Sequence, residues 1–193
     1  LPADGLIRED DLERGLLLLN DLPGMDVRSV LSPGAALGTS VVTAEVSEAA
    51  LVSGNLDFDN YGNKFSGPYR LGAARSLNEP AGYGDLLSAR ATASSGISYG
   101  RLAYQVPLGH SGLRFGGAYA ETHYELCCEF APLQARGEAR TVTLNAWYPF
   151  LRGRNLNLSG TAAFDARRYF NATLAGTTSD KRVNALTLGV NGD

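Results

Sequence analysis

Apolar and polar residues alternate through most of the chain, from about residue 51 to its end. Within 97–107, for example, Leu102 and Tyr104 alternate with Arg101 and Gln105. Because successive side chains of a β-strand point to opposite faces, this alternation indicates strands with one apolar and one polar face. Turn residues separate the runs, so we expect eight strands, at 51–59, 67–77, 85–94, 97–107, 112–123, 138–148, 155–168 and 182–190.

The first 48 residues follow a different pattern. Leu12, Leu16 and Leu19 recur at the spacing of one helix face, which predicts a helix at 7–20. Two short strands are expected after it, at 26–32 and 39–47, joined by a turn at 33–38. A helix followed by a hairpin forms a small α+β module that is too short to bury much core alone. We therefore expect further chain before Leu1.

The strands expected after residue 51 are about ten residues long, the length that crosses a membrane as a tilted strand. Tight turns that contain proline alternate with longer connections at 124–137 and 173–181, as in outer-membrane barrels. We therefore expect a mainly β fold: a partial transmembrane antiparallel β-barrel of about eight strands, preceded by a partial α+β module. Arginines near the middle of the strands are the candidate residues of a hydrated lumen: Arg70, Arg90, Arg101 and Arg114.

A soluble β-sandwich or a lipocalin-like barrel would show the same alternation. The length of the strands weighs against both, and so do the mid-strand arginines, because a barrel with a packed interior would have to turn them to solvent. Aromatic residues near the strand ends are candidates for the girdles found at membrane interfaces. These are Tyr61, Tyr69, Tyr83, Tyr119, Tyr124, Trp147, Tyr148 and Phe150.

The composition argues against several other functions. Seventeen basic and 20 acidic residues give a net charge of −3, and no basic cluster exists to neutralise the phosphates of a nucleic acid. No glycine loop has the spacing that cradles the phosphates of a nucleotide. No group of residues resembles a catalytic site, so we expect neither enzymatic activity nor a cofactor.

The histidines and cysteines do not match a known metal site. The histidines are His110 and His123, and the cysteines are the adjacent pair Cys127 and Cys128. His123 with both cysteines would lack the usual spacing of zinc ligands and a fourth ligand, so no metal is expected. Neighbouring cysteines rarely pair with each other, because the ring that they would form is strained. This pair therefore says little about the redox compartment.

Short segments of the sequence resemble one family. Residues 18–24 read LLNDLPG, 30–34 read VLSPG, and 59–63 read DNYGN. Together with GPYRLG at 67–72 and YGRLAY at 99–104, they are similar to the second POTRA domain and the first barrel strands of two-partner-secretion transporters. These transporters form the ShlB/FhaC/HecB haemolysin secretion and activation family, within the Omp85 superfamily.

The resemblance implies a pore in the bacterial outer membrane that recognises and translocates a large partner exoprotein, such as a haemolysin or an adhesin. Residues 1–48 would be the C-terminal part of a periplasmic POTRA domain, and 49–193 the N-terminal half of the barrel. The POTRA module would capture the partner as a strand added to an exposed sheet edge. Outer-membrane lipid is the other partner implied, and neither nucleotide nor nucleic acid is. The candidate contacts of the exoprotein are Val27, Arg28 and Val30.

Three other functions stay open. An Omp85-type assembly factor would share the module and the barrel, although LLNDLPG favours secretion. A passive porin would have no need of the helix and hairpin at 7–47. A soluble β-barrel binding protein would fold without detergent.

Overall fold

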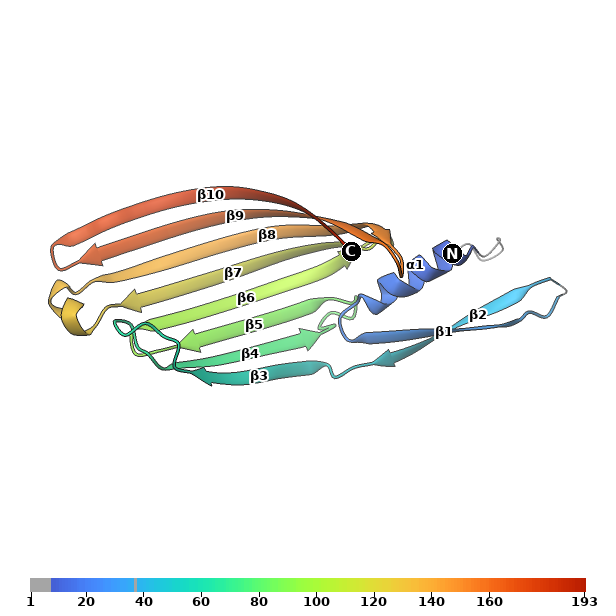
Figure 1. Ribbon diagram of the computed structural model, residues 1–193, viewed down its shortest axis with the longest axis horizontal. Helices are drawn as coiled ribbons and strands as arrows, with labels where there is room; N and C mark the ends of the chain where they lie inside the picture. The colour runs from blue at the N-terminus through green and yellow to red at the C-terminus, as the bar shows by residue number, and fades with distance from the viewer. Residues whose placement is uncertain (1–7, 37) are drawn as a thin grey trace.

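The computed structural model describes residues 8–36 and 38–193. A short helix and a two-stranded hairpin lie at one end of a long, curved eight-stranded sheet (Figure 1). Ile7, the first residue of the predicted helix, and Leu37, one residue of the predicted turn, lie outside the described residues. The strands of the large sheet are β3 (Val52–Asp59), β4 (Arg70–Asn78), β5 (Leu86–Ala93), β6 (Ile97–Leu108), β7 (Leu113–Glu125), β8 (Arg136–Arg152), β9 (Asn157–Thr173) and β10 (Gly176–Gly192).

The module consists of α1 (Glu9–Asn20), β1 (Met25–Pro33) and β2 (Ser40–Glu48), as the sequence predicts. Acidic residues fill the first turn of α1, where the helix dipole is positive. The chain then reverses through Gly24, which has a φ of +78°, a conformation that favours glycine. β1 and β2 pair antiparallel from Met25↔Glu48 to Pro33↔Ser40.

The large sheet confirms all eight predicted strands. Each strand pairs antiparallel with its neighbour in sequence, so the order runs from β3 to β10 without a crossover. Within the described residues the sheet is not closed, because β3 and β10 form its two edges. A short 3-10 helix, η1 (Cys128–Leu133), lies in the connection between β7 and β8.

The predicted polar loop at 173–181 is wrong. β9 continues to Thr173 and β10 begins at Gly176, so Leu174 and Ala175 alone connect them. Most residues between 173 and 181 are polar on both faces of the hairpin, so their composition is the same as that of a loop. Strands that extend into water have no need of an apolar face, so period-2 alternation disappears although the pairing continues.

Pairing register places every residue of the large sheet on one of two faces, because directly paired residues share a face. One face, the apolar face, carries most of the large hydrophobic side chains of the sheet, many of them exposed. Arg75 is a charged exception near the turns. The apolar face includes Leu56, Phe58, Leu71, Leu102, Tyr104, Phe115, Tyr119, Val142, Leu144, Phe164, Leu186, Leu188 and Val190.

The opposite face, the polar face, carries mainly small and polar residues among its charges. Across its middle, Arg90 pairs with Arg101, and the same row continues through Ala120 and Thr141 to Arg167. Trp147 and Tyr124 also lie on the polar face, since they pair with Arg114 and Gly137. Their prediction as members of an aromatic girdle is therefore wrong, because a position near a strand end does not define the face.

The two rims of the sheet differ. The connections beside α1, which we call the turn rim, are short and lie at 49–51, 79–85, 109–112 and 153–156. The opposite rim, the loop rim, carries the two longest connections, 60–69 and 126–135, together with the short turns 94–96 and 174–175 (Figure 1). None of the helices in the described part of the chain is both long enough and apolar enough to span a membrane.

Candidate functional site

The four arginines singled out by the sequence all lie on the polar face. Arg90 and Arg101 are direct cross-strand partners. Arg70 forms a two-point contact with Asp59, with Nε–Oδ1 and Nη2–Oδ2 distances of 2.8 and 3.1 Å. An oxygen of Asp57 lies 3.7 Å from Arg90.

Further charges, which sequence reasoning missed, join this face. Asp165 accepts a hydrogen bond of 2.6 Å from Thr143 and forms an ion pair of 2.6 Å with Arg167. The alternation could have revealed Asp165 and Arg167, since both are an even number of residues from Thr161 on β9 and therefore lie on the same face. The polar face is thus a broad surface of mixed charge and small side chains, which water can cover.

Arg114 has a different environment from the other three arginines. It lies at the turn rim, where its Nη2 donates a hydrogen bond of 2.6 Å to the main-chain carbonyl of Asp21. Its guanidinium also stacks 4.7 Å from the ring centre of Trp147. Arg114 therefore attaches the module to the sheet and does not stand free on the polar face.

A second arginine completes this attachment. Arg152, the last residue of β8, contacts the carboxylate of Asp21 at two points, with distances of 2.9 and 2.7 Å. The side chains of Asp21, Arg114 and Arg152 are each 25% exposed or less. We call these three residues the Asp21 joint.

The helix α1 also contacts the turns directly. Arg14 donates hydrogen bonds to the carbonyl oxygens of Pro149 at 3.0 Å and Ser111 at 3.4 Å. The carboxylate of Glu13 accepts a hydrogen bond of 2.6 Å from the main-chain N–H of Arg154. In the sequence these charges belong to the solvated side of a helix, so their role at the turn rim could not be recognised.

The free edge of β1 is partly occupied by a side chain. At the two ends of the hairpin, the N–H of Gly34 donates to the carbonyl of Thr39, and the N–H of Ala49 donates to the carbonyl of Gly24. Because peptide groups in an antiparallel pair point alternately toward and away from the partner strand, the even-numbered residues of β1 direct theirs at β2. Odd-numbered residues therefore point outward. At Val27 both outward groups bind the amide of Asn20, at 2.5 and 2.9 Å.

The three candidate contacts of the exoprotein differ in exposure. Arg28 and Val30 are exposed on one side of the hairpin, whereas Val27 is 5% exposed on the other. With its peptide group also occupied, Val27 is a packing residue of the module. Sequence alone could not show this, because an alternating strand does not reveal which face a helix covers.

One buried carboxylate organises the turn at 79–85. Asp85 accepts hydrogen bonds from the N–H groups of Ala81 and Tyr83 and from the hydroxyl of Tyr104, the last at 2.8 Å. Burial raises the pKa of Asp85, but these hydrogen bonds outweigh it, and the net pKa lies below its ordinary value. The carboxylate thus stays charged and holds the turn against β6.

The cysteines form a bond that was not expected from the sequence. Cys127 and Cys128 are joined in a disulfide, and neither sulfur is free to ligate a metal. The loops at the loop rim meet at this point: the N–H of Cys127 donates to the carbonyl of Phe65, and the rings of Phe65 and Phe130 pack edge to face. The expectation failed because it considered ring strain alone and not the loop that surrounds the pair.

The described part of the chain is thus a mainly β fold: an open eight-stranded antiparallel sheet with one apolar and one polar face, and a small module attached at its turn rim. The chain belongs to the ShlB/FhaC/HecB haemolysin secretion/activation family, whose model matches residues 38–192. It is 31% identical to the heme/hemopexin transporter protein HuxB of Haemophilus influenzae over 189 residues, which cover 96% of this chain and 34% of HuxB.

Solved structures give the same fold. CdiB from Escherichia coli superposes with a TM-score of 0.80 at 23% identity, over 94% of this chain and 35% of that chain. BamA from Haemophilus ducreyi superposes with a TM-score of 0.51 at 13% identity, over 94% and 36%. The chain thus spans about a third of the length of the curated relatives that it matches.

Proposed function

We propose that this chain is part of an outer-membrane pore that recognises a partner exoprotein and translocates it in two-partner secretion. The observation that carries the proposal is the attachment of a small module, through the Asp21 joint, to the rim of a sheet with one polar face. A passive porin has no use for such a module. Membership of a secretion family supports transport over both barrel assembly and catalysis.

The large sheet is proposed to be the first half of a barrel, within residues 49–193, with its apolar face toward lipid. On β9 the apolar face begins at Leu158 and reaches its first charge at Arg168. At 3.3–3.4 Å per residue this span is about 34 Å along the strand. With a strand tilt of about 40° it covers roughly 26 Å of membrane, close to the apolar band of outer-membrane barrels.

The polar face is then proposed to line the lumen. Arg70, Arg90 and Arg101 stand there among aspartates and small residues, an environment that water and an extended polypeptide could share. The mixture of positive and negative charges suits a channel for protein, because a lumen lined by charges of one sign would retain any segment of the opposite charge. Arg114, at the turn rim, supports the module and is the least suited of the four to contact a passing chain.

Residues 1–48 are proposed to be the end of a periplasmic POTRA domain that captures the exoprotein. Its exposed edge is β1, where an extended segment can add as a further strand. Asn20 occupies the edge at Val27, and Pro33 has no N–H to offer. Between these two positions, the peptide groups of Ser29 and Leu31 also point outward. Within residues 8–36 and 38–193 they have no hydrogen-bond partner. Arg28 and Val30 would flank the added strand.

A proline substitution tests this capture directly. Leu31→Pro removes an outward N–H at the edge, where proline is tolerated, so the hairpin remains paired. We expect secretion of the partner to fall at least tenfold, whereas Leu31→Ala, which keeps the N–H, retains most of it. Both variants should reach the outer membrane in equal amounts. Equal secretion by the two variants would show that the edge of β1 does not bind the exoprotein.

A wider test removes residues 9–48 from the full-length protein. Secretion should cease while the barrel still inserts in the outer membrane, as shown by its shift in mobility on unheated gels. If the partner reached the medium as well as before, the module would have no part in recognition.

A further inference from the structure

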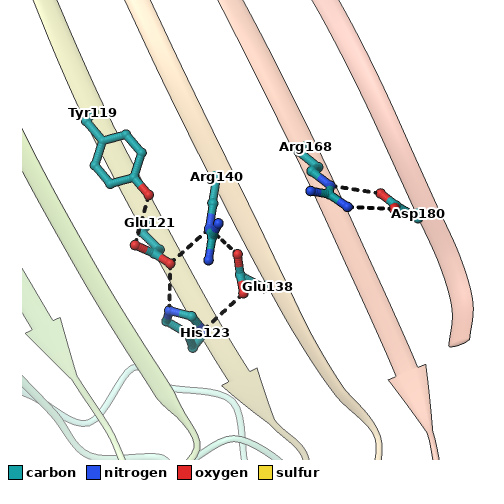
Figure 2. Close-up of polar contacts among 7 residues, drawn as sticks. All are labelled: Tyr119, Glu121, His123, Glu138, Arg140, Arg168 and Asp180. Carbon is teal, nitrogen blue, oxygen red and sulfur yellow. Dashed lines mark hydrogen bonds and ion pairs between the residues drawn. The ribbon is translucent and has the colours of Figure 1, made fainter. Parts of the chain in front are cut away.

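A compact polar cluster lies on the apolar face where its hydrophobic residues end, near the loop rim (Figure 2). On β7, Tyr119 is followed on the same face by Glu121 and His123. Across the strand pair, Glu121 is the partner of Arg140, and His123 is the partner of Glu138. Strand pairing therefore holds an imidazole and two carboxylates on neighbouring positions of a rigid sheet.

The imidazole of His123 stands between the two carboxylates. Its Nε2 is 3.0 Å from Oε1 of Glu121, and its Nδ1 is 3.9 Å from Oε2 of Glu138. The longer distance exceeds that of a hydrogen bond. A single metal ion would take only one of the two ring nitrogens, and the three ligand atoms, one per residue, lie within 4.8 Å of one another. Metal bonds of about 2.0–2.2 Å place ligand atoms roughly 3–3.5 Å apart.

Hydrogen bonds orient both carboxylates. The hydroxyl of Tyr119 donates a hydrogen bond of 2.9 Å to Oε2 of Glu121, which turns Oε1 toward the imidazole. Nε of Arg140 donates a hydrogen bond of 3.1 Å to the same Oε1, so a bound ion would share this oxygen with the guanidinium. Arg140 contacts Oε1 of Glu138, which leaves Oε2 facing His123. Neighbours that orient ligands in this way are characteristic of metal sites.

We propose that Glu121, His123 and Glu138 form a binding site for a divalent transition-metal ion of the zinc type. One nitrogen and two carboxylate oxygens, one from each residue, lie within 4.8 Å of one another. An imidazole ligand favours zinc, copper or nickel over calcium and magnesium, which prefer oxygen alone. The two glutamates carry two negative charges and Arg140 one positive charge, so the cluster attracts a cation.

The donor atoms need to approach by about an ångström to reach metal-ligand spacing. The glutamate side chains can make this movement, because both are partly exposed and have three rotatable bonds. The remaining coordination positions open to the outside of the sheet and can take water. The inference rests on strand register and side-chain contacts and is independent of secretion.

The nearby pair Arg168–Asp180 offers a matched comparison (Figure 2). It lies on the same face, one and two strands further along, and its guanidinium contacts the carboxylate at 2.8 and 3.1 Å. No histidine accompanies it, and both oxygens of Asp180 are engaged by the one arginine. Loss of this carboxylate should change surface charge as loss of Glu138 does, without changing metal binding.

Titration of the full-length protein in detergent with Zn²⁺, followed by calorimetry, tests the site. We expect one zinc ion to bind the wild type and Mg²⁺ to give no signal at the same concentration. His123→Ala and Glu138→Gln should each weaken zinc binding at least tenfold. His110→Ala, at the other histidine, and Asp180→Asn should bind as the wild type does.

Unchanged zinc affinity in His123→Ala or Glu138→Gln would overturn the proposal, as would an equal loss in Asp180→Asn. Each variant is checked for the mobility shift of a folded barrel, so lost binding is not confused with misfolding. If the wild type binds zinc but Leu31→Pro secretes the partner normally, the capture role alone is refuted. If Leu31→Pro secretes poorly but the wild type binds no zinc, the metal site alone is refuted.

Discussion

Asp21 and Arg152, which are 131 residues apart in sequence, form a two-point ion pair between the end of α1 and the end of β8. Paired hydrogen bonds of this kind define orientation as well as proximity, because two parallel contacts resist rotation. Arg114 of β7 approaches the same carboxylate to 3.9 Å. One carboxylate thus faces two guanidinium groups, and the position of the module depends on it.

This asymmetry predicts unequal effects of removing either partner. Asp21→Asn leaves Arg114 and Arg152 facing each other without an anion, whereas Arg152→Gln leaves Asp21 with Arg114. We expect Asp21→Asn to speed proteolytic release of α1 in the folded protein at least tenfold, equivalent to about 1.4 kcal/mol. Arg152→Gln should have a smaller effect.

The exposed pair between Glu13 and Arg154 provides the control, since a salt bridge at a largely exposed arginine contributes little. Arg154→Gln should leave the rate of proteolysis almost unchanged. If Asp21→Asn behaved in the same way, the joint would not hold the module in place.

Gly112 lies where α1 packs closely against the turn rim of the sheet. Its φ is +86°, and an added Cβ would lie 2.6 Å from Leu18 of α1 and 2.8 Å from the ring of Pro149. Gly109 in the same turn has a φ of +68° and no neighbour within 4 Å, so it isolates the cost of the backbone conformation.

We therefore expect Gly109→Ala to lower the free energy of unfolding by about 1 kcal/mol, through the left-handed conformation alone. Gly112→Ala should lower it by about 1–3 kcal/mol more, because the methyl group displaces α1 or Pro149. Urea unfolding in detergent measures both. Equal losses would show that α1 does not press on this turn.

Asp85 makes the stability of the turn rim depend on pH. Its pKa is lower in the folded protein than in the unfolded chain, so the stabilisation is complete at neutral pH and is lost as pH falls through the lowered value. Asp85→Asn replaces one accepting oxygen with a donor that faces the N–H groups of Ala81 and Tyr83. We expect the variant to lose about 1–3 kcal/mol at pH 7.

The difference between wild type and Asp85→Asn should be constant above about pH 5 and shrink at lower pH. Tyr104→Phe removes one of the hydrogen bonds and should give a smaller loss at pH 7. A difference that did not change between pH 7 and pH 3 would contradict the charged state assigned to Asp85.

Alternation was sufficient to predict the strands of the large sheet and to separate their faces. Arg90 and Arg101 could be assigned to polar faces from the sequence alone, because side chains alternate with a period of two. The hairpin beyond Thr173 could not be predicted, because its residues are polar on both sides. Composition there describes exposure to water and not the course of the backbone.

The specific contacts escaped prediction for a different reason. Glu121 and His123 are two apart on one strand, so their shared face was visible in the sequence. Glu138 joins them only through the register of β7 with β8, which depends on a connection whose length and shape the sequence did not define. The same limit applies to Asn20, whose amide resembles an ordinary helix-terminal residue until the path of β1 is known.

The assignment of faces predicts different access for two adjacent positions. Arg101 lies on the polar face and Leu102 on the apolar face of β6, so lumen water should reach the first and lipid should cover the second. In a background with Cys127 and Cys128 replaced by serine, Arg101→Cys and Leu102→Cys each introduce a single thiol. A membrane-impermeant maleimide, applied to the protein in its membrane, should label position 101 at least tenfold faster than position 102.

In urea the two thiols should react at the same rate, which would confirm that the folded sheet causes the difference. Equal labelling in the membrane would mean that the polar face does not line a water-filled pore, whatever passes through it.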